Sequence, residues 1–239
     1  MQKRLGSVQP LHTGAEMLLT LFGDDASVYS KLRQALVGAD AVINCVGILT
    51  ENGKNKFAAV QAEGAGRVAQ LAAAEGVETL VQVSAIGADA DSDSAYARTK
   101  AQGEAAVLDA FPNAVILRPS IVFGPEDEFF NRFASMSRLG PILPVVGADT
   151  KFQPVHVDDV ARAAEMAALG QAAPGIYELG GPDVDTFREL MENMLGEIRR
   201  RRLIVNQPFW LARLIAGGFD LLETLTLGLF HNSVLTRDQ

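Results

Sequence analysis

The stretch Leu80 to Lys100, LVQVSAIGADADSDSAYARTK, decides how the rest of the sequence is interpreted. Its first residues, Leu80 to Val83, are apolar except for Gln82 and predict the end of a buried strand, which Ser84 follows directly. After a polar loop, Tyr96 opens a predicted helix, and Lys100 comes four residues later. Because residues i and i+4 share one face of a helix, we expect the phenol and the ammonium to point toward one place.

These three side chains predict a catalytic site for hydride transfer at a carbonyl or hydroxyl carbon. A nearby ammonium favours the phenolate, so Lys100 is expected to lower the pKa of Tyr96 from about 10 toward the range of a general acid or base. Ser84 would bond the same substrate oxygen. The alternative is a solvated tyrosine–lysine pair, since Tyr-x-x-x-Lys also arises by chance in helices.

Further motifs follow this stretch in order. They are ILRPSIVFGP (116–125), FQPVHVDDVA (152–161) and the ending RRRRLIV (199–205) with PFWLARL (208–214). Together with the serine, tyrosine and lysine, they resemble the short-chain dehydrogenase/reductase superfamily, above all its extended and atypical branches. Within these branches the chain resembles bacterial relatives of the NAD(P)H-binding accessory subunit of respiratory complex I, through VSAIGADADSDSAYARTKAQGEAAVL (83–108) and RPSIVFGPEDEFFNRFA (118–134).

The resemblance implies an α/β fold, with a Rossmann-like parallel sheet flanked by helices and a small, mostly helical C-terminal substrate region. The predicted domains are residues 1–180 and 181–239. It also implies a nicotinamide cofactor, NAD or NADP, between which the sequence does not choose. The residues that it places at the cofactor are Val46, Gly47, Ser84, Tyr96, Lys100 and Pro119, with Lys100 bonding the nicotinamide ribose.

The N-terminal residues depart from the family pattern. Relatives begin with a strand, a glycine-rich loop and a helix whose free N–H groups hold the pyrophosphate. Here Met17 to Phe22 could form a strand, but Asp24 and Asp25 then open a helix and would repel a phosphate. Alternatively, residues 23–28 are the later turn near the adenine, and the first strand, helix and second strand are absent. Either way the cradle is expected to be missing or defective, and the chain to be truncated at both ends.

A predicted helix over residues 56–74 contains two features that matter for the site. Gly64 to Ala69 spells G-x-G-x-x-A, but inside a helix these small residues predict close packing against the sheet and no phosphate loop. Gln61 stands where the family commonly has an asparagine, which weakens the expected support for Lys100.

Residues Ala41 to Leu49, AVINCVGIL, are apolar on both faces, which is typical of an interior parallel strand. Such a strand needs a neighbour on each side. Thr79 to Val83 is expected on one side, and Met17 to Phe22 on the other.

The segment from Glu126 to Arg138 predicts an amphipathic helix with Phe129 on its apolar face. One interpretation is ordinary core packing. The other is an apolar wall for a bulky substrate, with Asn131 and Arg132 as its polar contacts.

The other predicted elements are strands at 115–118 and 176–179 and helices at 160–169 and 186–195. His156 lies beside Asp158 and Asp159, but a metal site needs further ligands, so no metal is predicted. We expect one of these aspartates to cap the helix that begins at Val160.

Composition limits the classes of function. The formal net charge of −8 over 239 residues disfavours nucleic acid as a partner. The single cysteine, Cys45, rules out a disulfide within the chain, fits a reducing compartment and is expected to be a small buried hydrophobe. We find no apolar run of about 18 or more residues that would predict a membrane span. The expected location is cytoplasmic, with a peripheral position at the inner membrane as an alternative.

The arginines at 199–202 precede a long apolar stretch, 208–230. An arginine cluster beside an amphipathic helix predicts contact with a membrane surface or with a subunit of a respiratory complex. The alternative is a helix that docks on the rest of the chain and leaves its charges solvated.

Three functions follow from these features. The first is an NAD(P)-dependent oxidoreductase, epimerase or dehydratase that acts on a small molecule through Ser84, Tyr96 and Lys100. The alternative is a non-catalytic, nucleotide-binding accessory or assembly protein of a respiratory (complex I-like) or quinone-linked system. The third is a truncated form that binds no cofactor.

Overall fold

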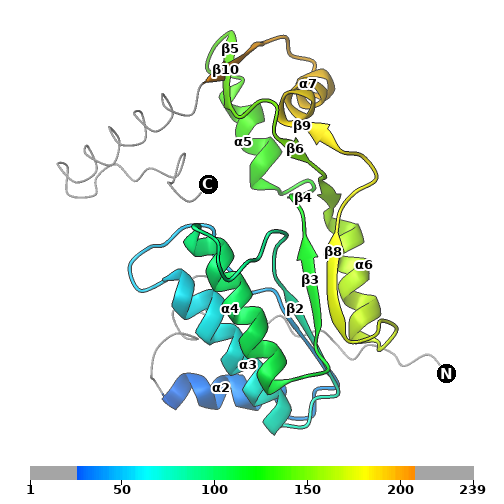
Figure 1. Cartoon of the computed structure of the whole chain (residues 1–239). Helices are drawn as coiled ribbons and strands as arrows, with labels where there is room; N and C mark the ends of the chain where they lie inside the picture. The colour runs from blue at the N-terminus through cyan, green and yellow to red at the C-terminus, as the bar shows by residue number, and fades with distance from the viewer. Residues whose placement is uncertain (1–25, 208–239) are drawn as a thin grey trace. The chain divides into compact units, whose positions relative to one another are not determined.

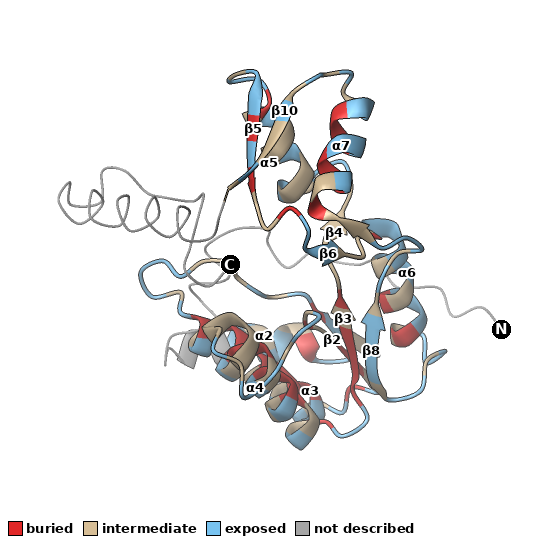
Figure 2. Cartoon of the chain, turned by 45° about the horizontal axis from the view of Figure 1, so that its top comes forward, coloured by how far each residue is buried: buried red, intermediate tan, exposed pale blue. Residues whose placement is uncertain are grey.

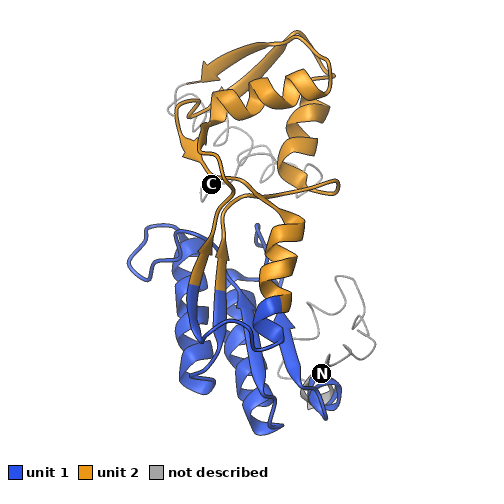
Figure 3. Cartoon of the chain, turned by 90° about the vertical axis from the view of Figure 1, so that its right-hand side faces the viewer, with its two compact units in different colours: residues 1–116, 166–176 blue, residues 117–165, 177–239 orange. Residues whose placement is uncertain are grey.

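The computed structural model describes residues 26–207. The chain divides into two compact units that alternate along the sequence (Figure 3). Unit 1 comprises Met1–Ile116 and Met166–Ile176, and unit 2 comprises Leu117–Glu165 and Tyr177–Gln239. The chain therefore passes between the units three times, and neither unit coincides with residues 1–180 or 181–239.

A four-stranded sheet has the order β1-β2-β3-β8 (Figure 1). Its strands are β1 (Ala41–Asn44), β2 (Thr79–Val83), β3 (Val115–Pro119) and β8 (Gly175–Leu179). The pair β1–β2 is parallel, and its register places Asn44 opposite Gln82. Alternation of strands with covering helices produces this arrangement. The predicted α/β Rossmann-like class is confirmed.

The helices of unit 1 are α2 (Ala26–Leu36), the π-helix η1 (Ala58–Glu63), α3 (Gly64–Ala74) and α4 (Ala95–Ala110). Because α3 continues η1 directly, the predicted helix at 56–74 is one helix whose first section is wider than an α-helix. Alanines of α3, Leu80 of β2 and Val107 of α4 form the buried core of the unit. Figure 2 shows the buried positions of these elements.

The small residues of α3 pack against the sheet, as predicted, and also against α4. A Cβ added to Gly66 would lie 3.0 Å from the Cβ of Ala106. Close approach of two helices requires small side chains at the contact. The motif Gly64 to Ala69 is helical and forms no loop.

The expected strand at 41–49 is wrong in its length. It ends at Asn44, where the side-chain oxygen accepts a hydrogen bond from the backbone N–H of Val46 and turns the chain out of the sheet (3.2 Å). Within residues 26–207, β1 pairs with β2 alone, and Ile43 is 44% exposed. The second expected neighbour, at 17–22, lies outside the described residues.

Unit 2 contains three helices and three pairs of short strands. The helices are α5 (Glu128–Met136), α6 (Val157–Ala168) and α7 (Phe187–Glu197). The pairs are β5 (Ile142–Val146) with β10 (Leu203–Gln207), β4 (Val122–Phe123) with β7 (Val155–His156), and β6 (Lys151–Phe152) with β9 (Asp185–Thr186). The first two pairs are parallel and the third is antiparallel.

The start of α6 differs from the prediction. The helix begins at Val157, three residues before the expected start, so Asp158 and Asp159 lie in its first turn and do not cap it. Instead, Nδ1 of His156 accepts a hydrogen bond from the backbone N–H of Asp158 (3.2 Å). The imidazole is thereby engaged in local backbone structure.

Two of the four consecutive arginines donate hydrogen bonds to the C-terminal end of helix α5. Nη1 of Arg200 donates to the carbonyl oxygen of Ala134 (3.0 Å) and to Oγ of Ser137 (2.9 Å). Nε of Arg202 donates to the carbonyl oxygen of Ser137 (2.7 Å). The last carbonyl groups of a helix lack partners within it, so positive donors stabilise that end. The apolar stretch at 208–230 lies outside the described residues.

Candidate functional site

The end of β2 and the first two turns of α4 carry the three predicted catalytic residues, all within unit 1. Helix α4 begins after Ser94, whose hydroxyl accepts a hydrogen bond from the N–H of Ala97 (3.4 Å). The helical period then places Nζ of Lys100 over the ring of Tyr96, 5.8 Å from its centroid. The structure thus brings Tyr96 and Lys100 together, as the spacing predicts.

The hydroxyl of Ser84 is buried and lacks a hydrogen-bond partner within the described part of the chain. The residue is 5% exposed. A buried hydroxyl without a partner costs free energy, so such groups are uncommon unless a ligand or water completes them. Ser84 therefore offers a donor and an acceptor that residues 26–207 leave unused.

Lys100 lies against the backbone at Gly47, the residue expected to approach the cofactor. A Cβ added to Gly47 would lie 3.1 Å from Nζ of Lys100. Lys100 is 7% exposed, and burial lowers the pKa of its ammonium, while Glu104 and Cys45 act in the opposite direction. A less basic amine in a confined place is suited to hydrogen bonding with a neutral hydroxyl.

The expected lowering of the Tyr96 pKa is wrong. Burial of the phenol raises the pKa of Tyr96 above its ordinary value, because desolvation disfavours the charged phenolate. The ring also packs edge-on against Phe57, with centroids 5.9 Å apart. Tyr96 is therefore held as a neutral phenol.

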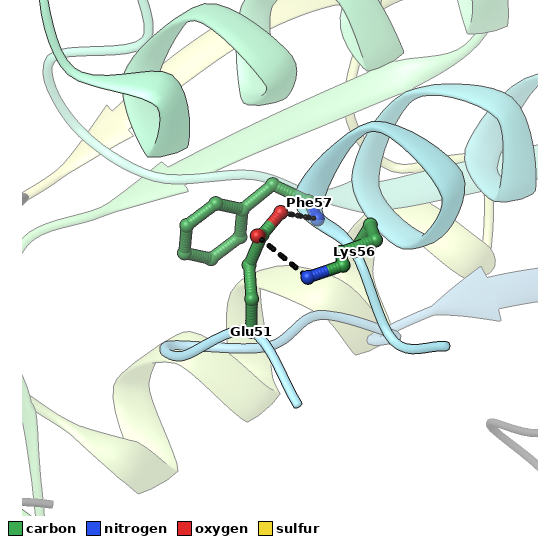
Figure 4. A network of polar contacts seen from close by, with 3 residues as sticks. All are labelled: Glu51, Lys56 and Phe57. Atoms are coloured by element: carbon green, nitrogen blue, oxygen red, sulfur yellow. Dashed lines mark hydrogen bonds and ion pairs between the residues drawn. The ribbon is translucent and has the colours of Figure 1, made fainter. Parts of the chain in front are cut away.

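A charged contact fixes Phe57 in this position (Figure 4). Oε1 of Glu51 accepts a hydrogen bond from the backbone N–H of Phe57 (2.9 Å), and Oε2 pairs with Nζ of Lys56 (3.3 Å). A carboxylate at this position caps the first turn of the following helix. The consequence for the site is a buried aromatic wall, since Phe57 is 4% exposed.

Gln61 joins two segments that lie next to Lys100, and the expected weakening of support for the lysine stays a prediction. Nε2 of Gln61 donates to the carbonyl oxygen of Ile48 (2.6 Å), and its Oε1 accepts from Oγ1 of Thr99 (3.1 Å). The buried amide thus connects the loop after β1 to the residue that precedes Lys100. The sequence marks Gln61 only as a departure from the family pattern, because its two partners are distant along the chain.

Cys45 is exposed, so the expectation of a buried cysteine is wrong. It follows Asn44, where the chain leaves the sheet and turns its side chains outward. The protein around the sulfur still raises the pKa of the Cys45 thiol, and Lys100 lowers it.

The remaining predicted site residues belong to unit 2. Pro119 is the buried last residue of β3. Phe129 packs in an aromatic cluster with Phe133, Phe152 and Phe187, as in the core-packing interpretation. Nδ2 of Asn131 donates to the carbonyl oxygens of Pro125 (3.0 Å) and Asp127 (2.8 Å), and Arg132 lies one residue further along α5.

The sequence matches the family described as RmlD substrate binding domain over residues 22–206. The chain is a member of this family. It is an extended short-chain dehydrogenase/reductase relative of the complex I subunit, as the resemblance predicts.

Two curated relatives with different names are similar to this chain. NADH dehydrogenase (ubiquinone) 1 alpha subcomplex subunit 9, mitochondrial, of Arabidopsis thaliana is 38% identical over 196 residues, 80% of this chain and 48% of the relative. Ceramide reductase of Caulobacter vibrioides is 32% identical over 173 residues, 72% of this chain and 54% of the relative. The chain spans about half the length of the curated relatives it matches.

The solved structures include dTDP-4-dehydrorhamnose reductase from Bacillus anthracis in complex with NADP. It matches with a TM-score of 0.64 at 18% identity, over 75% of this chain and 70% of that chain. This likeness shows the shared fold. Residues 26–207 of this RmlD-type chain contain no helix long and apolar enough to span a membrane.

The described residues fit one part of a nicotinamide dinucleotide. Ser84 has a buried hydroxyl without a partner, and Lys100 has an ammonium beside the bare backbone of Gly47. A hydroxyl and an ammonium of this kind can form hydrogen bonds with the ribose hydroxyls and the carboxamide group of the nucleotide. The N-terminal residues, where the pyrophosphate cradle is expected to be missing or defective, lie in 1–25, outside the described part of the chain.

Proposed function

We propose that this chain is a nucleotide-binding accessory or assembly protein of a respiratory, complex I-like system. The observation that carries the proposal is the 38% identity, over 80% of the chain, to a named subunit of NADH dehydrogenase. In this function Ser84, Lys100 and the backbone of Val46 and Gly47 bind NAD or NADP as a structural ligand. The protein is then held at the inner membrane by its partner complex.

The environment of Tyr96 supports a binding function over turnover. A general acid or base works best when its pKa lies near the working pH. Burial moves the pKa of Tyr96 away from that range, while the same burial strengthens hydrogen bonds to a bound ligand. Tyr96 in the accessory protein therefore binds and orients the nucleotide.

A second function is reduction of a carbonyl compound, with epimerase or dehydratase chemistry as variants. The similarity to a ceramide reductase and the unused hydroxyl of Ser84 favour it. The nicotinamide would supply a hydride to the carbonyl carbon. Tyr96 would give its phenolic proton to the oxygen, and Ser84 would hold that oxygen in place.

Thermal unfolding of the protein with NADH and NADPH tests nucleotide binding. At a ligand concentration of 100 times Kd, the accessory function predicts about 2.7 kcal/mol of added stability. Lys100→Met should reduce the added stability, while Lys151→Met in unit 2 should leave it unchanged. If high concentrations of NADH and NADPH add no stability, this function is excluded.

Turnover separates the two functions when binding is observed. The accessory function predicts no oxidation of NAD(P)H by quinones, nucleotide sugars or long-chain ketones. Turnover that is lost in Tyr96→Phe and retained in Tyr177→Phe would establish the reductase instead.

The partner is tested by native electrophoresis of solubilised membranes from cells that carry a tagged chain. The accessory function predicts comigration with assembled complex I, and a smaller amount of assembled complex when the gene is removed. Normal assembly without the chain would contradict the proposal.

A further inference from the structure

Two buried amide side chains lie opposite each other at the ends of β1 and β2. Asn44 is 5% exposed and Gln82 is 4% exposed, although both occupy strands that are otherwise apolar. Nδ2 of Asn44 donates to Oε1 of Gln82 (2.8 Å). Burying two amides costs free energy unless they are paired, so the pairing requires a reason beyond packing.

The amide pair continues at each end into a backbone group. Oδ1 of Asn44 accepts from the N–H of Val46 (3.2 Å), and Nε2 of Gln82 donates to the carbonyl oxygen of Val83 (3.0 Å). The result is a line of three hydrogen bonds from Val46 to Val83. Each end of this line lies one residue before a site residue, Gly47 at one end and Ser84 at the other.

The backbone groups fix the direction of both amides. Val46 offers only a hydrogen, so Asn44 must present its oxygen to Val46 and its NH₂ group to Gln82. Gln82 must then present its oxygen to Asn44, which leaves its NH₂ group for the carbonyl of Val83. No member can rotate by 180° without placing two oxygens, or two NH₂ groups, against each other.

We propose that Asn44 and Gln82 are positioning residues that hold the loop at Gly47 and the strand end at Ser84 at the separation that the bound nucleotide requires. This inference rests on the proposed nucleotide-binding function and identifies which residues prepare the site before the ligand arrives. A prepared site loses less conformational freedom on binding, so the pair increases affinity without touching the ligand.

The sharpest test replaces the side-chain NH₂ group of Asn44 by an oxygen, through the substitution Asn44→Asp. In Asn44→Asp an ionised carboxylate faces Oε1 of Gln82, and reversal of Gln82 would only move the repulsion to Val83. Once protonated, the aspartic acid donates to Gln82 again and restores the line. Binding of NADP⁺ relative to wild type should therefore be reduced about tenfold at about pH 8 and recover at about pH 5, since burial raises the pKa of the new carboxyl.

Controls remove the effects of charge and stability. Cys45 follows Asn44 in the chain, and it interacts electrostatically with Lys100, which also interacts with Glu104. These groups titrate in wild type as well, so affinity is compared with wild type at each pH. The double variant Asn44→Leu/Gln82→Leu removes both amides, so it is expected to fold and to bind about tenfold more weakly at both pH values. Val107→Ala weakens the core of the same unit and should leave affinity unchanged.

The outcomes distinguish this inference from the proposed function. Wild-type affinity in the double variant, or equal loss of affinity at both pH values in Asn44→Asp, overturns the positioning role. If the wild type binds neither nucleotide, the proposed function fails, and hydrogen exchange at the Val46 amide then tests the line of hydrogen bonds itself. Equal exchange rates in wild type and the double variant would overturn it.

Discussion

Gly103 of α4 lies directly against the backbone carbonyl oxygen of Gln61 in η1, with no space for a side chain between them. A Cβ added to Gly103 would overlap that oxygen. The wider turn of the π-helix brings the carbonyl toward α4, and glycine is the residue that admits it. The same residue of η1 also bonds through its side chain to Ile48 and Thr99, so its backbone and its side chain both fix the position of η1 beside α4.

Gly103→Ala should destabilise unit 1. The new methyl group meets backbone, which cannot move aside, and overpacking of this kind costs about 1–3 kcal/mol. Gly196 of α7 is the matched control, since its Cβ would meet nothing within 4 Å. Gly196→Ala should stabilise by about 0.5–1 kcal/mol through helix propensity. Chemical denaturation of both variants checks the prediction, which fails if the two substitutions have the same sign.

Replacing Lys100 should change how stability depends on pH. Burial lowers the pKa of Lys100 in the folded state, so the unfolded chain binds more protons between that pKa and the ordinary value of 10.5. Stability then rises with pH across this window, by at most about 1.4 kcal/mol per pH unit. Lys100→Met should therefore gain most over wild type at neutral pH and least near pH 10, as measured by denaturant unfolding. A constant difference would contradict the lowered pKa.

Alkylation of Cys45 reports the same lysine chemically. The thiol is exposed, and Lys100 favours its thiolate while burial opposes it. Because the thiolate is the reactive form, Lys100→Met should slow modification by iodoacetamide at neutral pH. Lys56→Met, whose ammonium pairs with Glu51, is the control and should leave the rate unchanged. An unchanged rate in Lys100→Met would show that the charge is not close enough to act.

Replacing Arg200 should destabilise unit 2, whereas replacing the neighbouring Arg201 should not. Arg200→Met removes the donor to Ala134 and leaves the fully buried Ser137 with a lost partner, at a cost of about 1–3 kcal/mol. Arg201 is exposed, and Arg201→Met should change stability by less than about 0.5 kcal/mol. Unfolding followed by the signals of α5 residues checks the difference. Equal effects would mean that the contacts with α5 contribute nothing.

The hydrophobic pattern correctly predicted the elements whose buried residues follow the regular spacing of a strand or a helix. The strand at 80–83 and the helix that begins near Tyr96 are present, because runs of apolar residues and the period of 3.6 reflect local geometry. The prediction of a strand over residues 41–49 was wrong because of one residue, Asn44. Asn44 uses its side chain to turn the chain, and an apolar run such as CVGIL cannot reveal that the ladder has already ended.

The electrostatic predictions failed for a different reason. The spacing of Tyr96 and Lys100 correctly predicted their proximity, but the direction of a pKa depends on how much water surrounds the phenol. Burial at Tyr96 comes partly from Phe57, thirty-nine residues earlier in the chain. Likewise the partners of Gln61 and Gln82 belong to other elements, so their functions appear only when the elements are assembled.

The hydrogen bonds from Arg200 and Arg202 to the end of α5 join residues 63 to 66 positions apart. During translation, at about 5–20 residues per second, helix α5 leaves the ribosome several seconds before these arginines. Phe187, which completes the aromatic cluster of α5, also leaves the ribosome seconds after that helix. The nascent chain therefore carries exposed phenylalanines throughout this interval, and a chaperone that shields them would raise the yield of folded protein.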